Sequence, residues 1–200
     1  YSWKENCIPL GYSLITGEIR ELNLEQNSVF LISCGQKRHG KRFLEDIAQS
    51  LLITGKEVVW VRGDATLQLH REEKKEKCFL IADLTEFIQQ ISKSDEECRE
   101  RLLFWEMIAR GKVKDCFLAG AYNCMQDSHL MAEPIFRELS LHQSGIHIGG
   151  NSGNQRVFSF DDLGYARLNQ READSTGYWK QSPFSRSERI FIPGISEEEQ

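Results

Sequence analysis

The chain has 200 residues, of which 40% are hydrophobic and 28% charged, and its formal net charge is −5. This length and composition predict one sizeable globular domain, which we place over residues 1–200. The acidic balance disfavours a nucleic-acid binder that works by neutralising phosphates, so we expect no nucleic-acid partner. No apolar run reaches the roughly 18–20 residues of a membrane span. Because the chain begins with Tyr1 and not with methionine, we expect it to be a fragment of a longer protein.

The first predicted elements are two short strands within residues 8–24, joined by a turn at Thr16-Gly17. Apolar and polar residues alternate imperfectly along the second of them, as in a half-buried strand. The sequence therefore predicts a short N-terminal β-hairpin.

The next segment is the centre of the predicted fold. Val29–Ser33 is an apolar, strand-like run, residues 34–42 form a glycine-rich basic loop, and an amphipathic helix follows and ends at Gly55. The residues that recur at helical spacing and are expected to face a sheet are Phe43, Leu44, Ile47, Leu51 and Leu52.

Alternating strands and helices follow. We predict strands at 57–62, 78–83, 116–122 and 145–150, short strands at 157–160 and 189–193, and helices at 85–92, 95–110 and 127–142. Pro134 requires an early position in its helix or a kink, and residues 164–187 are expected to be irregular. This order predicts an α/β fold with a mainly parallel central sheet and helices on both faces.

The basic loop reads Gly35-x-x-x-x-Gly40-Lys41-Arg42, which matches the phosphate-binding pattern Gly-x-x-x-x-Gly-Lys-Ser/Thr except at its last position. Such a loop offers backbone N–H groups and a helix dipole to phosphate. ATP is therefore the candidate cofactor. The predicted nucleotide-binding residues of this loop are Gly35, Gln36, Lys37, Arg38, His39, Gly40, Lys41 and Arg42. The alternative is a relic turn with flexible glycines and solvated basic side chains.

Two departures from the pattern bear on hydrolysis. The hydroxyl that normally ligates Mg²⁺ is replaced by Arg42, whose guanidinium cannot bind a cation, so Mg²⁺ is not expected. Asp83 ends an apolar strand and is a predicted site carboxylate, but the residue after it is Leu84. Glu86 is the remaining candidate for a catalytic base, although it could equally cap the helix that begins there.

Two further features each allow two interpretations. Asn123 follows a predicted strand and could sense a γ-phosphate or cap a loop. Tyr178, Trp179 and Phe184 could be partner anchors or parts of the core.

The lead-in IPLGYSLITGEIRELNLEQNSVFLISCG, the strand and loop at GIHIGG, and the closing RIFIP resemble FtsK/SpoIIIE-type motor domains. The sequence looks most like the C-terminal, degenerate ATPase domain of the membrane-anchored type VII secretion ATPase, the EssC/EccC-like proteins. This resemblance implies a RecA-like P-loop NTPase fold. In such ATPases a Glu follows the strand-end Asp and polarises the attacking water, and this chain has Leu84 in its place.

The resemblance also implies a biological setting. The domain would lie in the cytoplasm as part of a membrane-anchored protein with tandem ATPase domains, which could form a hexamer. Its partners would be those neighbouring domains and small helical WXG100-type export substrates. We therefore expect a hydrolysis-deficient module that recognises substrates or regulates its neighbours. An active hydrolase that uses Lys41, Asp83 and Glu86 is the alternative, and a DNA translocase is a third hypothesis.

Overall fold

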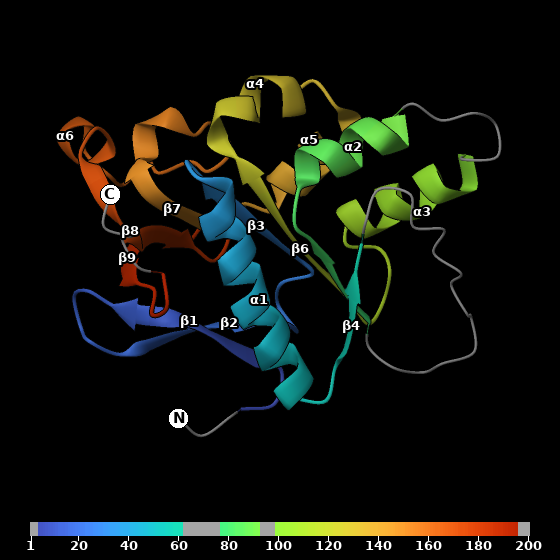
Figure 1. Ribbon diagram of the computed structural model, residues 1–200, viewed down its shortest axis with the longest axis horizontal. Coiled ribbons are helices and arrows are strands. Elements are labelled where there is room, and N and C mark those ends of the chain that lie inside the picture. Colours follow the sequence, from blue (N-terminus) through green and yellow to red (C-terminus); the bar gives the residue numbers. More distant parts are fainter. Residues whose placement is uncertain (1–3, 62–76, 93–98, 196–200) are drawn as a thin grey trace.

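The computed structural model describes residues 4–61, 77–92 and 99–195 (Figure 1). Within these residues nine strands form one sheet in the order β2-β1-β9-β8-β7-β3-β6-β5-β4. The strands are β1 (Cys7–Ser13), β2 (Ile19–Asn23), β3 (Val29–Cys34), β4 (Glu57–Trp60), β5 (Lys77–Ile81), β6 (Cys116–Asn123), β7 (Gly145–Asn151), β8 (Arg171–Lys180) and β9 (Glu188–Phe191). The helices are α1 (Lys37–Ile53), α2 (Leu84–Ser92), α3 (Arg99–Ala109), α4 (Asp127–Leu130), α5 (Pro134–Leu141) and α6 (Tyr165–Leu168), with 3₁₀ turns η2 (Cys124–Gln126) and η3 (Ser152–Asn154).

The sheet has a parallel half and an antiparallel half. Strands β7, β3, β6, β5 and β4 are parallel neighbours, with β3 in the middle between β6 and β7. Strands β8, β9, β1 and β2 continue the sheet through antiparallel pairs. The predicted α/β fold class and the N-terminal hairpin are confirmed. When the five parallel strands are numbered 1 to 5 along the chain, their order across the sheet is 5-1-4-3-2.

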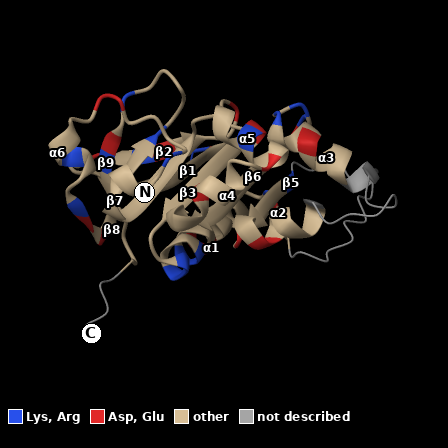
Figure 2. Ribbon diagram, turned by 90° about the horizontal axis from the view of Figure 1, so that it is seen from above, with Lys and Arg blue, Asp and Glu red and all other residues tan. Residues whose placement is uncertain are grey.

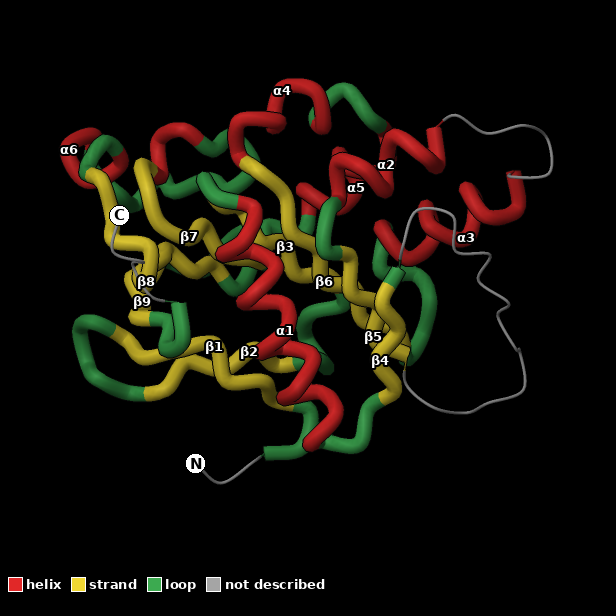
Figure 3. Tube along the Cα trace, viewed as in Figure 1, coloured by secondary structure: helices red, strands yellow, loops and turns green. Residues whose placement is uncertain are grey.

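Helices cover the two faces of the sheet. Helix α1 packs on one face, where Figure 3 shows it in front of the strands, and α2, α3 and α5 pack on the other face. Because side chains alternate along β3, Phe30 and Ile32 pack with α1 on one face. Val29 and Leu31 pack on the other face, in a core cluster that includes residues of α2, α3 and α5. That cluster includes Trp105 of α3, which meets Phe79 edge to face at a ring-centroid distance of 5.3 Å. None of the described helices combines the length and apolar character that crossing a membrane requires.

Helix α1 differs from its prediction in one important respect. It begins at Lys37 and not after Arg42, so the predicted loop at residues 34–42 is wrong beyond Gln36. Lys and Arg are good helix formers, and Gly40 allows the helix to approach the sheet closely. A Cβ atom at Gly40 would lie 2.9 Å from Cys34 Sγ. The predicted stripe is buried except for Leu52, which is 53% exposed.

Two further predictions fail in the C-terminal part. Residues 157–160 form no strand, and residues 164–187, expected to be irregular, contain α6 and the ten-residue strand β8. Pro134 takes the first position of α5, which divides the predicted helix 127–142 into two. The predicted start of the helix at Asp95 lies outside the described residues.

Candidate functional site

A cavity of about 360 Å³ lies where β3, β5 and β6 end, which is the edge where α/β sheets bind ligands. The loops after these strands and the first turns of α1 and α2 surround it. The lining residues are Cys34, Lys37, Ala82, Asp83, Thr85, Gln89, Ala121, Tyr122, Asn123 and Gln126. Of the predicted nucleotide-binding residues, this set contains Lys37 and Asp83.

Asp83 holds two elements together at this cavity. One carboxylate oxygen accepts the backbone N–H groups of Thr85 at 3.0 Å and Glu86 at 3.2 Å, which caps the start of α2. The other oxygen forms an ion pair with the Lys37 ammonium. The hydrogen bond that Lys37 donates to Asp83, and then the negative charge of that carboxylate, raise the pKa of Lys37.

Asn123 ties the third strand to the same edge. Its side-chain amide donates to the Gly35 carbonyl oxygen at 3.3 Å, and its oxygen accepts the Met125 N–H at 2.9 Å. Asn123 is the N-cap residue of η2, so the loop-capping interpretation is confirmed.

Lys41 and Arg42 do not reach the cavity. Both are exposed on α1 and form ion pairs along the helix, Lys41 with Glu45 at 4.0 Å and Arg42 with Asp46 at 3.3 Å. Arg42 instead lines a separate groove between the hairpin and α1. Although Lys41 and Arg42 belong to the sequence motif, neither of them therefore lies beside Asp83.

Two residues of the predicted loop, Gln36 and His39, contact Asp174 of β8. Gln36 donates to the Asp174 carboxylate at 3.5 Å, and the buried His39 ring lies 3.6 Å from it. Arg38 donates to the His39 ring nitrogen at 3.3 Å. Asp174 was missed because its strand was predicted to be irregular, although the β-forming residues Thr176 and Tyr178 are a signal that could have indicated it.

The positions after Asp83 have structural roles. Leu84 is fully buried, and a Cβ atom at Gly120 would lie 2.6 Å from its Cγ. Glu86 is exposed on α2 and accepts a hydrogen bond from Gln90 at 3.2 Å. The Asp83 carboxylate in this lining is thus engaged by the start of α2 and by Lys37, while Arg42 lines the separate groove.

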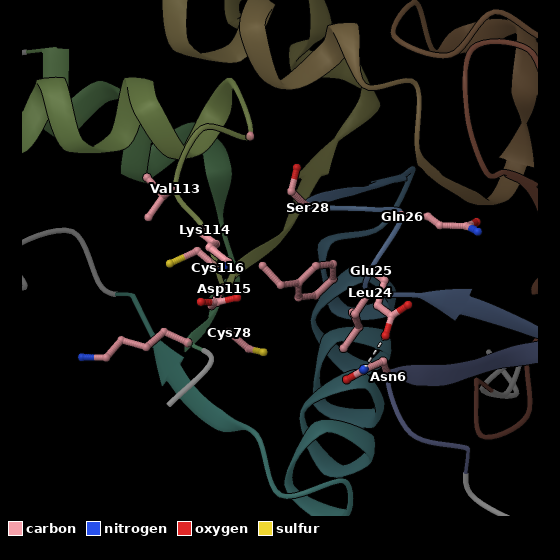
Figure 4. Close-up of a pocket in the computed structure, with 13 residues that line it drawn as sticks. Asn6, Leu24, Glu25, Gln26, Ser28, Cys78, Val113, Lys114, Asp115 and Cys116 are labelled. Atoms are coloured by element: carbon pink, nitrogen blue, oxygen red, sulfur yellow. Dashed lines mark hydrogen bonds between the residues drawn. The ribbon is translucent and has the colours of Figure 1, made fainter. Parts of the chain in front are cut away.

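Two other cavities lie away from this edge. One of about 390 Å³ is at the opposite ends of the parallel strands, and Figure 4 shows Cys78, Cys116, Asp115 and Leu24 among the residues that line it. The other, which we call the hairpin groove, has a volume of about 380 Å³. It is lined by Pro9, Leu10, Gly11, Tyr12, Ile19, Arg42, Phe43, Asp46, Ser50, Ile192, Pro193 and Gly194.

The sheet order and the strand–helix unit at β3–α1 define a domain with the RecA-like ATPase fold. No family model and no curated protein matches the chain. Solved structures do match it, and four of them are type VII secretion ATPases of the EssC and EccC kind. The cytoplasmic domain of EssC has a TM-score of 0.71 at 13% identity, and the match covers 97% of this chain and 44% of that one.

Two of these structures contain tandem ATPase domains. EssC (ATPases 2 and 3) from Geobacillus thermodenitrificans has a TM-score of 0.71 at 17% identity, covering 96% of this chain and 42% of that one. Thermomonospora curvata EccC (ATPases 2 and 3), solved in complex with a signal sequence peptide, has a TM-score of 0.67 at 12% identity, covering 97% and 41%. This chain thus spans less than half of each structure, and the similarity confirms the predicted resemblance at the level of the fold.

Proposed function

We propose that this chain is a degenerate ATPase module of a type VII secretion motor, which recognises export substrates or regulates neighbouring ATPase domains and does not hydrolyse ATP. The observation that carries the proposal is the start of α1 at Lys37. Gly40, Lys41 and Arg42 belong to this helix, and the side chains of Lys41 and Arg42 pair with acidic residues on its exposed face. A phosphate loop needs these residues around the phosphates.

The buried Leu84 supports the same proposal. A carboxylate that polarises water would need to point into the cavity, but this position points into the core beside Gly120. The site thus lacks a base at this position, because the packing of α2 on β6 directs the side chain of residue 84 into the core. Glu86 does not compensate, because it is on the exposed side of α2.

The proposed setting is that of the similar structures. The chain would be a cytoplasmic domain of a membrane-anchored protein, beside further ATPase domains and within a hexamer. Its substrates would be small helical WXG100-type proteins. Figure 2 shows basic and acidic residues interspersed over the described elements, which differs from the basic face of a typical nucleic-acid binder.

The hairpin groove is the surface that we propose for substrate recognition. Its lining is mainly apolar, with Leu10, Tyr12 and Phe43 inside and the charged pair Arg42 and Asp46 beside them. Such a groove suits the apolar side of a helical peptide. The occupant we propose is a signal sequence peptide, the ligand that is named in the EccC structure.

Calorimetric titration tests the nucleotide part of the proposal. We expect no motor-like ATP hydrolysis and no binding of Mg-ATP by the wild type, and no gain in Arg42→Thr, because that position faces the hairpin groove. Hydrolysis that Lys41→Ala abolishes would show a working phosphate loop and overturn the proposal.

A second titration tests recognition with a signal sequence peptide from a WXG100-type substrate. We expect Tyr12→Ala to weaken binding roughly tenfold or more, since truncating one well-placed aromatic anchor commonly costs over 1 kcal/mol. Lys41→Ala is the matched control, because this exposed residue of the same helix does not line the groove. Equal affinities of the wild type and Tyr12→Ala would exclude the groove as the peptide site.

A further inference from the structure

The turn between β8 and β9 presents a phenylalanine to solvent. Phe184 is 98% exposed, and its neighbour Pro183 is exposed as well. Strands β8 and β9 are antiparallel neighbours and pair up to Trp179 and Glu188, so residues 181–187 form the tip of a hairpin, which we call the β8–β9 tip. A single exposed apolar residue is common on protein surfaces, so exposure alone does not indicate a partner.

Hydrogen bonds within the tip fix the backbone that carries Phe184. The Ser185 hydroxyl accepts the Gln181 N–H at 3.0 Å and the Ser182 N–H at 2.9 Å, and it donates to the Ser182 carbonyl oxygen at 2.9 Å. The Ser185 N–H closes the turn on the same carbonyl at 3.2 Å. Pro183 adds a fixed φ at the second position of the turn. The turn therefore needs little further ordering when the phenylalanine ring binds a partner.

Both ends of the tip are bonded to other parts of the chain. The Gln181 side chain donates to the Gln26 side chain at 3.1 Å. Ser187 donates twice to the Asp162 carboxylate, from its N–H at 2.8 Å and from its hydroxyl at 2.6 Å. An exposed aromatic ring on such an ordered support has the properties of an interface anchor.

The hairpin groove is complementary to this ring in size and in chemistry. Its volume of about 380 Å³ falls within the range of roughly 300–1,000 Å³ that holds small ligands, so a phenyl ring fits. Leu10, Phe43 and Ile192 contribute apolar side chains to its lining, and Tyr12, which is 44% exposed, adds an aromatic ring. Aromatic rings pack favourably on one another, so the groove suits a phenylalanine.

The charges beside the two surfaces are complementary too. Arg186 is exposed two residues after Phe184, and Asp46 of α1 lines the groove. Arg42 pairs with the Asp46 carboxylate at 3.3 Å, yet burial raises the pKa of Asp46 more than Arg42 lowers it. This carboxylate is therefore only partly compensated, and it can accept a second cation.

The tip and the groove of one molecule lie at opposite ends of β9. The tip ends at Ser187, before this strand, whereas residues 192–194 line the groove after the strand. An extended strand of four residues spans roughly 13 Å. Because Asp162 and Gln26 also bond the tip in place, Phe184 can reach such a groove only on another molecule.

We propose that the β8–β9 tip of one copy of this chain docks in the hairpin groove of a second copy, with Phe184 as the anchor and Arg186 beside Asp46. Because the two surfaces differ, the contact is heterologous and can repeat from copy to copy. It gives a ring where the rotation between copies closes and an open chain where it does not. The inference uses the groove only as a surface and does not depend on its binding an export substrate. A peptide that enters the same groove has to displace the tip.

Sedimentation of the full chain, without peptide or nucleotide, tests the self-association. We expect the mean mass of the wild type to rise with protein concentration. Phe184→Ser should weaken the association roughly tenfold or more, since an aromatic anchor commonly carries that share of a contact. Arg186→Glu should weaken it as well, because it places a second negative charge beside Asp46. Tyr165→Ser is the matched control, since Tyr165 is 84% exposed on α6, away from the tip, and it should leave the association unchanged.

Mixing two variants tests whether the tip meets the groove. Tyr12→Lys removes the aromatic ring from the groove and adds a charge that repels Arg186, but it leaves the tip intact. Phe184→Ser leaves the groove intact. Each variant alone should stay largely monomeric, and their mixture should form a one-to-one dimer that grows no further, because one tip and one groove remain.

Three results would each overturn the proposal. They are a wild type that stays monomeric at all concentrations, an association that persists undiminished in Phe184→Ser, and an equimolar mixture of the two variants that stays monomeric. None of these results involves a peptide, so the recognition titration decides the proposed function separately.

Discussion

The Lys37 ammonium and the Asp83 carboxylate form an ion pair that joins the first turn of α1 to the start of α2. In the sequence motif Lys41 is the residue expected near phosphate, yet in the folded chain Lys37 lines the cavity. Asp174 contacts the same turn of α1 from the opposite side, through Gln36 and His39. Carboxylates near a helix N-terminus are stabilising, so these contacts favour an early start of the helix.

We expect Gly40→Ala to destabilise the protein by about 1 kcal/mol. The substitution gains helix propensity, but the new Cβ atom would lie 2.9 Å from Cys34 Sγ and 3.0 Å from Ala121 Cβ. Urea denaturation measures the change. Gly35→Ala is the control, because nothing lies within 4 Å of a Cβ atom there. If both variants were equally stable, α1 would not pack against β3 as described.

Replacing Leu84 with glutamate restores the residue type of an active ATPase, but we expect it to destabilise the protein by about 3 kcal/mol or more. Leu84 is fully buried between α2 and β6, so the carboxylate would lose its hydration without gaining a partner. Leu84→Met should cost less than about 1.5 kcal/mol. A stable Leu84→Glu variant with new ATPase activity would contradict the inward orientation of this position.

The sequence is sufficient to predict the helices and strands whose apolar residues form a clear pattern along the chain. The α1 stripe at Phe43, Ile47 and Leu51 is such a case, and so is the apolar strand β3. The first turn of α1 could not be predicted, because it depends on Asp83 and Asp174, which come from distant parts of the chain. Local sequence alone could not distinguish a phosphate loop from a helix that contains the same glycine and lysine.

Strand β8 was missed for a different reason. All of its residues from Thr176 to Lys180 are buried, so it lacks the alternation that identifies a half-exposed strand. Tyr178 and Trp179 are core residues there, whereas Phe184 is 98% exposed in the following loop. The core interpretation is therefore confirmed for Tyr178 and Trp179, whereas the partner-anchor interpretation of Phe184 stays a prediction.

Arg189→Leu tests the buried carboxylate of Glu172 in this half of the sheet, and we expect a loss of about 3 kcal/mol. Glu172 is 2% exposed, and Arg189 contacts its carboxylate through Nε at 2.8 Å and Nη2 at 2.5 Å. Removing the cation leaves a buried charge without its counter-charge. Lys4→Ala, which breaks the solvent-exposed pair with Glu21, is the control and should cost far less in the same unfolding assay. Similar losses in both variants would indicate that Glu172 is hydrated.

His147→Asn should make the stability of the protein less sensitive to acid. Burial lowers the pKa of His147 to about 4 from its ordinary value of 6.5, so the folded state disfavours its protonation. The contribution of the neutral ring is present above about pH 6.5 and is lost as the pH falls toward 4, by up to roughly 3 kcal/mol. Asparagine cannot be protonated in this range and retains a group that can bond to Ser33.

Denaturation measured from pH 7 to pH 4 should therefore show a steeper loss of stability in the wild type than in His147→Asn. Parallel curves would show that His147 is not the acid-sensitive group. Asp127 acts in the opposite direction over part of this range, so the comparison is best repeated in the Asp127→Asn background, where the difference between the two curves should persist.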